Sequence, residues 1–175
     1  IAACDVAWGG GDSLSMPIAY VYGSDVYIHD VVFNRGDKDV TKPIIIAKAK
    51  EHMPHKMRFE ANNGGGEYAD DVDRQLREQK VHVNITARKA PNNISKFGRI
   101  VQFAPDIKRF YFLKDGKDEN GKPYRSKEYQ DFMNELTMFS QTGKNPHDDA
   151  ADSLAMLADE LFHGTAKIEI GTRPF

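Results

Sequence analysis

The sequence predicts an α/β fold with a central mixed sheet, an antiparallel meander plus parallel strands, flanked by helices. Three observations predict it: three β-rich runs open the chain, strand-like and helix-like segments alternate after them, and a helix with an apolar stripe follows near the end. Consecutive β-rich runs joined by short turns pair antiparallel, whereas strands separated by helices tend to pair in parallel. We therefore expect both kinds of pairing in one sheet.

The individual elements follow from periodicity and from turn residues. We expect strands at residues 1–7, 16–22, 25–33, 56–60, 81–85 and 108–113. We expect helices at residues 41–52, 67–79, 93–103, 126–138 and 145–162. Together they form one domain over residues 1–164, followed by a tail at 165–175, because 175 residues suit a single core.

In the first half of the chain, turn and capping residues set the boundaries. Gly23 and Ser24 separate two β-rich runs and predict a hairpin. Thr41 is the expected N-cap of the next helix, and Pro43 is tolerated in a first turn. The glycine-rich run at residues 62–66 lacks the Lys-Ser/Thr of a phosphate-binding P-loop, so we expect a tight strand-to-helix turn there.

In the second half of the chain, the spacing of apolar residues predicts the elements. Ile94, Phe97 and Ile100 recur at helical spacing, and the aromatic run at residues 110–112 predicts sheet core. The polar, glycine-containing segment at residues 114–123 predicts an exposed hairpin tip or a mobile loop.

The last predicted helix carries an acidic residue that needs an explanation. Asn145 is the expected N-cap and Pro146 the first helical residue, while Asp148 and Asp149 favour the helix dipole. Asp152 would then lie beyond the capping turn, beside the apolar stripe. A carboxylate in that position must be solvated, paired or bound to a cation.

Two further acids stand at the ends of predicted strands. Asp5 lies near the end of the first strand, and Glu60 ends a later one. Ligands of α/β sheets bind beyond strand ends next to a topological switch, so these acids can meet Asp149 and Asp152 there. Carboxylates suit Mg²⁺ or Mn²⁺, and two such ions support phosphodiester hydrolysis.

Each acid also has a purely structural interpretation. Asp5 could cap a turn, Glu60 could pair with Arg58 or Lys56, and Asp148 could serve the helix dipole. His147 is expected at the surface.

Composition bounds the class of protein. The single cysteine, Cys4, excludes a disulfide framework and fits a reducing compartment, and no signal peptide or membrane-spanning run is present, so we expect a soluble protein without a membrane partner. The chain begins without Met in a strand-like run, which indicates a fragment of a longer protein. Residues 88–127 hold eleven Lys/Arg against four Asp/Glu, a net +7 that leaves −9 for the rest. That asymmetry fits a polyanionic partner or a solvated surface.

The order of motifs resembles a known family. The Asp-bearing first strand and meander, Phe59-Glu-Ala-Asn-Asn-Gly-Gly65 before a helix, Lys96-Phe-Gly-Arg-Ile100, and Pro146-His-Asp-Asp-Ala-Ala-Asp-Ser-Leu154 are similar to the ribonuclease H-like nuclease domain of tailed-phage large terminase subunits. The resemblance covers residues 1–163. The spacing of Asp149 and Asp152 is also similar to the closing helix of the Holliday-junction resolvase of the same fold.

The resemblance implies a ribonuclease H-like endonuclease that cuts concatemeric viral DNA during genome packaging with two Mg²⁺ or Mn²⁺ ions. It implies that Asp5 and Glu60 are strand ligands and that the last helix supplies the remaining carboxylates, Asp149 and Asp152 before Asp148. Implied partners are double-stranded DNA, an ATPase domain before Ile1, a small terminase subunit and a portal, in the host cell cytoplasm; the isolated domain is expected to be monomeric.

Given this resemblance, we expect basic residues of the segment 88–127 to bind DNA phosphates. The expected DNA-binding residues are Lys89, Lys96, Arg99, Lys114, Lys117, Lys122 and Arg125. Two other functions stay open: a junction resolvase or transposase-type nuclease of the same fold, and a non-catalytic DNA- or partner-docking module whose acids are structural.

Overall fold

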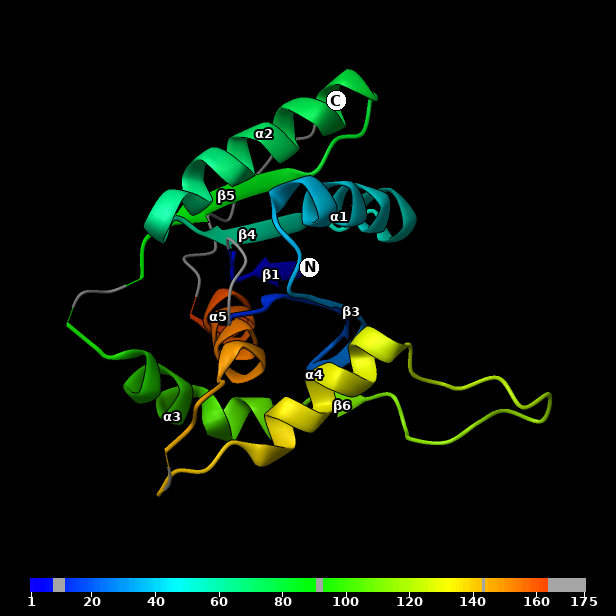
Figure 1. Ribbon diagram of the computed structural model, residues 1–175, viewed down its shortest axis with the longest axis vertical. Helices are drawn as coiled ribbons and strands as arrows, with labels where there is room; N and C mark the ends of the chain where they lie inside the picture. Colours follow the sequence, from blue (N-terminus) through cyan, green and yellow to red (C-terminus); the bar gives the residue numbers. More distant parts are fainter. Residues whose placement is uncertain (8–11, 91–92, 143, 164–175) are drawn as a thin grey trace, which may run out of the picture.

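The computed structural model describes residues 1–7, 12–90, 93–142 and 144–163, so the predicted tail at 165–175 lies outside the described residues. Within these ranges six strands form one mixed sheet in the order β5-β4-β1-β2-β3-β6. Helices cover both faces of the sheet (Figure 1). The predicted α/β class, with a meander and parallel strands together, is confirmed.

The sheet has an antiparallel meander at its centre and parallel pairs on both sides of it. The strands are β1 (Ala2–Cys4), β2 (Leu14–Tyr22), β3 (Asp25–Asn34), β4 (Lys56–Glu60), β5 (Asn84–Arg88) and β6 (Tyr111–Phe112). The first three form the predicted meander, with the hairpin between β2 and β3. β4 pairs in parallel with β1, and β5 with β4. β6 pairs in parallel with β3, so the pairing changes direction at β1 and again at β3.

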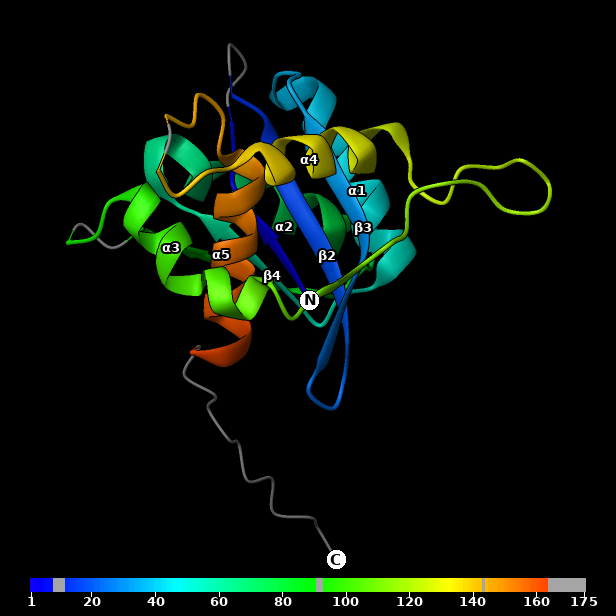
Figure 2. The ribbon, with the colours of Figure 1, turned by 90° about the horizontal axis from the view of Figure 1, so that it is seen from below.

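The helices form two layers with separate cores. The helices are α1 (Lys38–His52), α2 (Gly65–Glu78), α3 (Lys96–Ile107), α4 (Lys127–Met138) and α5 (Asp149–Phe162). α1 and α2 lie on one face, where apolar side chains such as Ile45 and Val72 pack on the sheet. α3, α4 and α5 lie on the other face, around Leu154 and Phe132 (Figures 1 and 2). Among the helices described, none combines the length and apolar character required to cross a bilayer.

Several helix starts differ from the prediction, and in α1 and α3 the capping side chain explains the difference. Asp37, and not Thr41, caps α1 by accepting hydrogen bonds from the N–H groups of Asp39 and Val40. Thr41 lies inside the helix and is buried. Similarly, Ser95 caps α3 by accepting from the N–H of Gly98, so the helix begins at Lys96 rather than at residue 93.

Three strands differ clearly in extent. β1 covers 2–4 instead of 1–7, and Asp5 follows it in an isolated bridge to Ser15. β5 lies at 84–88 instead of 81–85, because Val83 is buried in the approach to the sheet while the ladder with β4 begins at Asn84. β6 spans two residues instead of 108–113. Of its aromatic run Phe110 is buried as predicted, whereas Tyr111 is exposed and stacks on Tyr27.

The polar segment between β6 and α4 forms a projecting hairpin. Residues 114–125 extend away from the rest of the domain (Figure 1), and a single bridge joins Lys117 to Pro123. At its base the Arg125 Nε donates to the Leu113 carbonyl at 2.8 Å, and the Lys114 Nζ lies 4.3 Å from the ring centre of Tyr124. The prediction of an exposed hairpin tip is confirmed.

The start of α5 is the correction that matters most for the site. The helix begins at Asp149, three residues after the predicted first helical residue, Pro146. Asn145 does not cap it, because its side chain bonds both the N–H and the carbonyl of Ser140 at 2.9 and 2.8 Å. Asp152 therefore belongs to the first turn of α5, and not to the helix interior as predicted.

Candidate metal centre

Two parallel strands bring the first two carboxylates together. Cys4 of β1 is in register with Phe59 of β4, so the residues that follow, Asp5 and Glu60, lie at the same edge of the sheet. The first turn of α5 adds Asp152. One oxygen of each residue lies within 4.8 Å of the others, a spacing at which the three could hold a metal ion. We refer to Asp5, Glu60 and Asp152 as the carboxylate cluster.

Small residues allow α5 to approach the sheet closely enough to place Asp152. Three small residues of α5 are buried in the core: Ala150, Ala151 and Ala155. The hydroxyl groups of Ser153 and Ser15 lie 2.8 Å apart and form a hydrogen bond between α5 and β2. Asp152 is consequently 1% exposed although it is an acid.

A glycine is required where β4 ends at Glu60. A Cβ atom on Gly65 would lie 1.9 Å from the Glu60 carbonyl oxygen, so another residue would force the start of α2 away from the strand. Gly64 before it has φ 86°, which glycine adopts without strain. Asn62 in the same turn donates to the Glu60 carboxylate at 2.9 Å. Residues 62–64 form the predicted tight strand-to-helix turn, and α2 begins at Gly65, two residues before its predicted start. The turn holds Glu60 in place.

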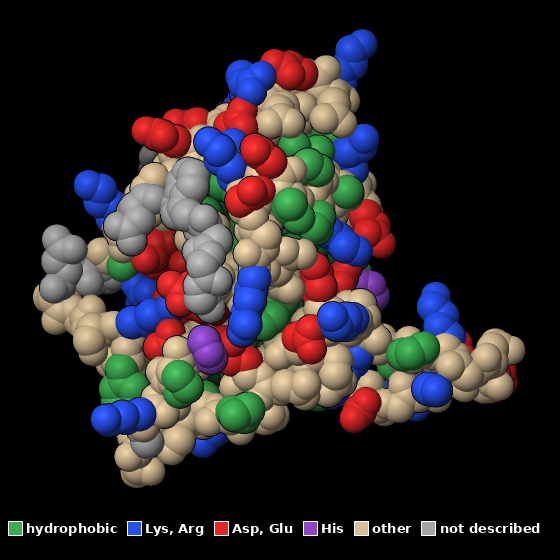
Figure 3. Space-filling model, viewed as in Figure 1, with side chains coloured by type: hydrophobic (Ala, Val, Ile, Leu, Met, Phe, Trp, Pro, Cys, Tyr) green, Lys and Arg blue, Asp and Glu red, His purple; other side chains and the backbone are tan. Residues whose placement is uncertain are grey.

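Lys96 of α3 extends its ammonium group into the centre of the acids. Its Nζ lies 2.9 Å from Asp148, 3.1 Å from Asp149, 3.5 Å from Asp5 and 3.6 Å from Asp152. The ammonium group thus contacts acids on both α5 and the strand end of Asp5. Acidic and basic side chains are gathered in this part of the surface in Figure 3.

Arg99, one helical turn after Lys96, joins two members of the carboxylate cluster. Its Nε and Nη2 donate to the two oxygens of Asp152 at 2.9 and 2.6 Å, and Nη2 also donates to Glu60 at 3.1 Å. The alternative interpretation, in which Glu60 pairs with Arg58 or Lys56, is wrong, because Glu60 pairs with Arg99. The side chains of Arg58 and Lys56 pair instead with Asp159 and Glu160 near the end of α5.

Asp148 and Asp149 lie beside the carboxylate cluster. Asp149 is buried, and its Oδ2 accepts a hydrogen bond from the Ser13 N–H at 2.8 Å. Asp148 is more exposed and contacts Lys96. The structure therefore places Asp152 nearest to Asp5 and Glu60, with Asp148 and Asp149 on the side of Lys96.

The centre carries uncompensated negative charge. Five carboxylates face two cations, a formal excess of three negative charges. Burial raises the pKa of Asp5 to about 7; Lys96 opposes that shift, and Asp152, Glu60 and Asp149 add to it. Burial also raises the pKa of Asp152 against the effect of Arg99. Hard divalent cations prefer such an oxygen-rich, negatively charged set, so these residues fit Mg²⁺ or Mn²⁺.

The predicted DNA-binding residues separate into two groups. Lys96 and Arg99 lie among the acids. The second group is Lys89, Lys114, Lys117 and Lys122, which are exposed, and Arg125, which is half-buried at the base of the hairpin. Sequence reasoning missed the pairing of Lys96 and Arg99 with the acids, although their separation of three residues places them on one face of a helix.

The comparisons with known proteins identify the family and the fold of this chain. Residues 4–108 match the family model described as Terminase Bacteriophage T7, Ribonuclease H-like domain. That range includes Asp5, Glu60, Lys96 and Arg99. No curated protein matches the chain.

Solved structures show the same fold at low sequence identity. The nuclease domain of the large terminase subunit of bacterial virus Sf6 is 12% identical with a TM-score of 0.55, over 90% of this chain and 86% of that one. The human cytomegalovirus terminase nuclease domain, soaked with manganese and bound to an inhibitor, is 10% identical with a TM-score of 0.58, over 91% and 81%. The large terminase of a thermophilic bacteriophage is 9% identical with a TM-score of 0.53, over 91% of this chain and 39% of that one. The chain belongs to the family of terminase ribonuclease H-like domains.

Proposed function

We propose that this domain is a metal-dependent endonuclease that cuts concatemeric viral DNA during genome packaging. The observation that carries the proposal is the carboxylate cluster, in which acids from β4, α5 and the residue after β1 converge within 4.8 Å. The buried excess of negative charge supports it, because such an arrangement is costly unless a cation compensates it. Family membership supplies the substrate class.

Asp5, Glu60 and Asp152 are the proposed ligands of Mg²⁺ or Mn²⁺, with Asp149 and then Asp148 as further ligands. Two bound ions would activate water and stabilise the leaving oxygen of a phosphodiester. Arg99 holds Asp152 and Glu60 in fixed orientations through its fork of N–H groups. The Ser13 N–H does the same for Asp149.

Lys96 has a separate proposed role. Its ammonium group neutralises the acids in the metal-free protein, and it can turn toward solvent because its side chain is 38% exposed. Once turned, it can meet a DNA phosphate. Lys96 would therefore pair with the acids in the metal-free protein and with a DNA phosphate after the metal ions bind.

The test uses supercoiled plasmid with Mn²⁺ and the isosteric variants Asp5→Asn and Asp152→Asn. We expect nicking and linearisation by the parent and a loss of at least about 100-fold in both variants, because each loses a charged ligand. Asp70→Asn, at an exposed aspartate of α2, is the matched control and should cut like the parent. Full activity in Asp5→Asn would remove Asp5 from the site.

An inactive parent is resolved by two further measurements. Titration calorimetry with Mn²⁺ tests the ligands without DNA, and no binding would favour a non-catalytic docking module. Preference for a four-way junction over linear duplex would favour a resolvase.

The wider setting is also proposed. We infer that the domain acts with an ATPase domain, a small terminase subunit and a portal on double-stranded DNA in the host cell cytoplasm. The low share of the thermophilic-phage large terminase that this chain matches, 39%, is in line with a larger working protein. Restoring plasmid cleavage to an inactive domain by adding the ATPase part would support this.

A further inference from the structure

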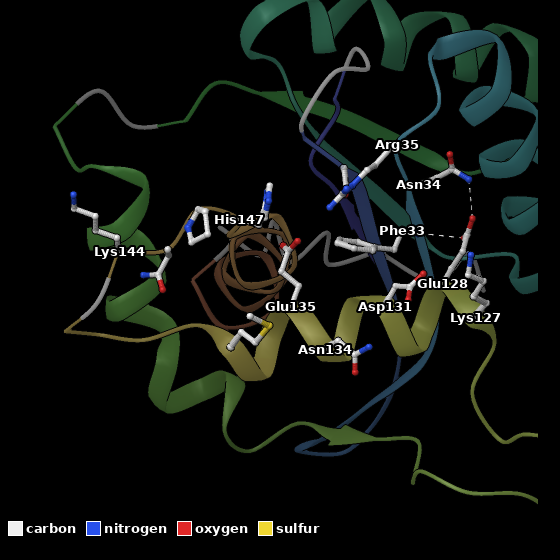
Figure 4. Close-up of a pocket in the computed structure, with 14 residues that line it drawn as sticks. Phe33, Asn34, Arg35, Lys127, Glu128, Asp131, Asn134, Glu135, Lys144 and His147 are labelled. Carbon is white, nitrogen blue, oxygen red and sulfur yellow. Dashed lines mark hydrogen bonds between the residues drawn. The ribbon is translucent and has the colours of Figure 1, made fainter.

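A pocket of about 730 Å³ lies directly beside the candidate metal centre. It is bounded by the end of β3, one side of α4 and the segment before α5 (Figure 4). Its volume falls within the range of sites that hold small ligands or a nucleotide-sized part of a larger one. None of the residues predicted to bind DNA lines it.

The pocket and the metal centre share a wall. Ser13 lines the pocket, and its N–H donates to Asp149 of the centre at 2.8 Å. On the pocket side the Ser13 hydroxyl accepts a hydrogen bond from the Arg35 Nε at 3.3 Å. Glu135 of α4 accepts from the Ala150 N–H at 2.9 Å, next to Asp149. A ligand in this pocket would therefore lie next to the group bound at the acids.

Basic side chains reach the pocket from three segments. Arg35 follows β3, Lys127 begins α4, and Lys144 and His147 precede α5; all four are exposed. Figure 4 shows Arg35 and Lys144 on opposite sides of the opening. Flexible, exposed cations on opposite sides of a hollow suit a linear polyanion better than a compact anion.

Two of the three acids in the lining are engaged within the fold. Glu128 accepts from the Phe33 N–H at 3.2 Å and from the Asn34 amide at 2.9 Å (Figure 4). Glu135 accepts from Ala150 as described, and burial raises its pKa. Asp131 is the third acid. The cations are exposed and can turn toward a ligand.

The lining also offers apolar surface. Phe33, Pro146 and the exposed Met138 contribute to it between the charged groups. Deoxyribose alternates with phosphate along a DNA strand and presents this combination of apolar and anionic surface. A compact anion alone would leave the apolar part of the lining unused.

We propose that this pocket binds the sugar–phosphate backbone of the DNA strand on one side of the phosphate to be cut. Arg35, Lys127 and Lys144 contact phosphates, and Phe33 and Met138 contact sugar. The inference rests on the proposed nuclease function, which it extends by a substrate subsite. In this proposal the bound DNA strand passes over the end of β3 and continues toward the first turn of α5.

The first test measures binding rather than cleavage. Fluorescence anisotropy of a labelled 30-base-pair duplex in EDTA is followed from low to high salt, for the parent and for the pair Arg35→Gln and Lys144→Gln. Each lost phosphate contact reduces the slope of log K against log salt by about 0.9, so we expect a reduction of about 2 and a roughly tenfold loss of affinity. The control pair, Lys50→Gln and Arg74→Gln, removes the same charges from α1 and α2 on the other sheet face and should leave the slope unchanged.

A second test locates the strand. The sequence has one cysteine, Cys4, which is 1% exposed, so a new surface cysteine is the sole accessible thiol. Asn134→Cys places that thiol on the pocket wall, and Lys50→Cys is the control on the far face. With duplexes carrying a thiol tether on successive phosphates, we expect disulfide crosslinks for Asn134→Cys near the cleavage position and none for Lys50→Cys.

The outcomes separate this inference from the proposed function. Suppose that the parent binds Mn²⁺ and cuts DNA. If the variant with Arg35→Gln and Lys144→Gln (the pocket pair) then keeps the parent's salt slope, and Asn134→Cys forms no crosslink, the pocket does not bind the DNA strand. If the parent binds neither Mn²⁺ nor DNA, the nuclease function itself fails and the subsite fails with it. Unchanged Mn²⁺ affinity of the pocket pair, with a reduced slope, supports the subsite.

Discussion

At the scale of single residues, two cations of α3 determine how much of the carboxylates' negative charge is neutralised. Lys96 and Arg99 neutralise part of a buried negative charge that comes from two strand ends and one helix. They differ in geometry. Arg99 forms paired hydrogen bonds with Asp152, whereas Lys96 lies at 2.9 to 3.6 Å from four acids without a fixed pairing. A divalent ion can therefore displace Lys96 more readily than Arg99.

We expect Lys96→Gln to bind Mn²⁺ more tightly than the parent. The substitution removes a positive charge that competes for the same oxygens, and a gain of roughly tenfold corresponds to about 1.4 kcal/mol of reduced repulsion. Titration calorimetry without DNA measures it. The control is Lys50→Gln, an exposed lysine of α1. Weaker Mn²⁺ binding by Lys96→Gln would show that Lys96 supports the ion instead of competing with it.

At the scale of elements, the approach of α2 to β4 depends on one glycine. We expect Gly65→Ala to destabilise the domain by roughly 3 kcal/mol, because its Cβ would lie 1.9 Å from the Glu60 carbonyl oxygen and the backbone must move. Urea unfolding measures this, and Mn²⁺ affinity should fall with it because Glu60 moves.

Gly66→Ala is the matched control for this effect. A Cβ there would meet the Ala61 Cβ at 4.0 Å, an ordinary contact, and alanine favours a helix over glycine by about 0.5–1 kcal/mol. We therefore expect Gly66→Ala to be neutral or slightly stabilising. Equal losses in the two variants would contradict the steric argument.

A second element-scale prediction concerns β3 and α1. Asp30 of β3 faces Lys48 at 2.6 Å and His52 at 3.0 Å, and it accepts from the Val31 N–H; Glu51 also contacts Lys48. Burial would raise the pKa of Asp30, but these donors outweigh it and lower the pKa below the ordinary 3.8.

The sign of the pH effect follows from that direction. The unfolded chain binds a proton at Asp30 more readily than the folded one, so this stabilisation is present above pH 3.8 and is lost as the pH falls through the lower folded pKa. We expect Asp30→Asn to cost roughly 2 kcal/mol at pH 7 and less at pH 3. Unfolding curves at both pH values check it; Asp70→Asn should keep the parent's pH profile.

How much the sequence predicted also differs between elements. The meander, the hairpin, α4 and the strand ends at Asp5 and Glu60 follow from local alternation and turns, and these predictions are confirmed. The start of α5 was wrong because Asn145 bonds Ser140, a contact that capping preference alone does not reveal. The strand β5 was misplaced because apolar residues mark burial, whereas pairing is set by the neighbouring strand.

For the site, sequence reasoning found the acids but not their cations. Asp5, Glu60 and Asp152 could be named from strand ends and from an acid beside an apolar stripe. The contacts of Arg99 and Lys96 require α3 to pack across α5, which no local pattern specifies. The roles assigned to these residues remain predictions until the metal and cleavage measurements are made.

At the scale of the whole molecule, the projecting hairpin is separable from the fold. We expect replacement of residues 115–123 by Asn-Gly to change the free energy of unfolding by less than about 1 kcal/mol, because the segment is largely exposed. If Lys117 and Lys122 contact DNA, the salt slope of DNA binding should fall by about 2. Circular dichroism and anisotropy measure the two effects. Lys117→Gln with Lys122→Gln keeps the loop and should give the same slope as the replacement.

The position of the acids along the chain has a consequence for synthesis. Asp5 leaves the ribosome well before Asp152, which closes the cluster through contacts of high sequence separation. A nascent or truncated chain that lacks α5 has the strand acids without their helical partner. Any transient opening of α5 in the finished protein also separates them. If the domain cuts DNA as proposed, that activity is therefore coupled to complete folding.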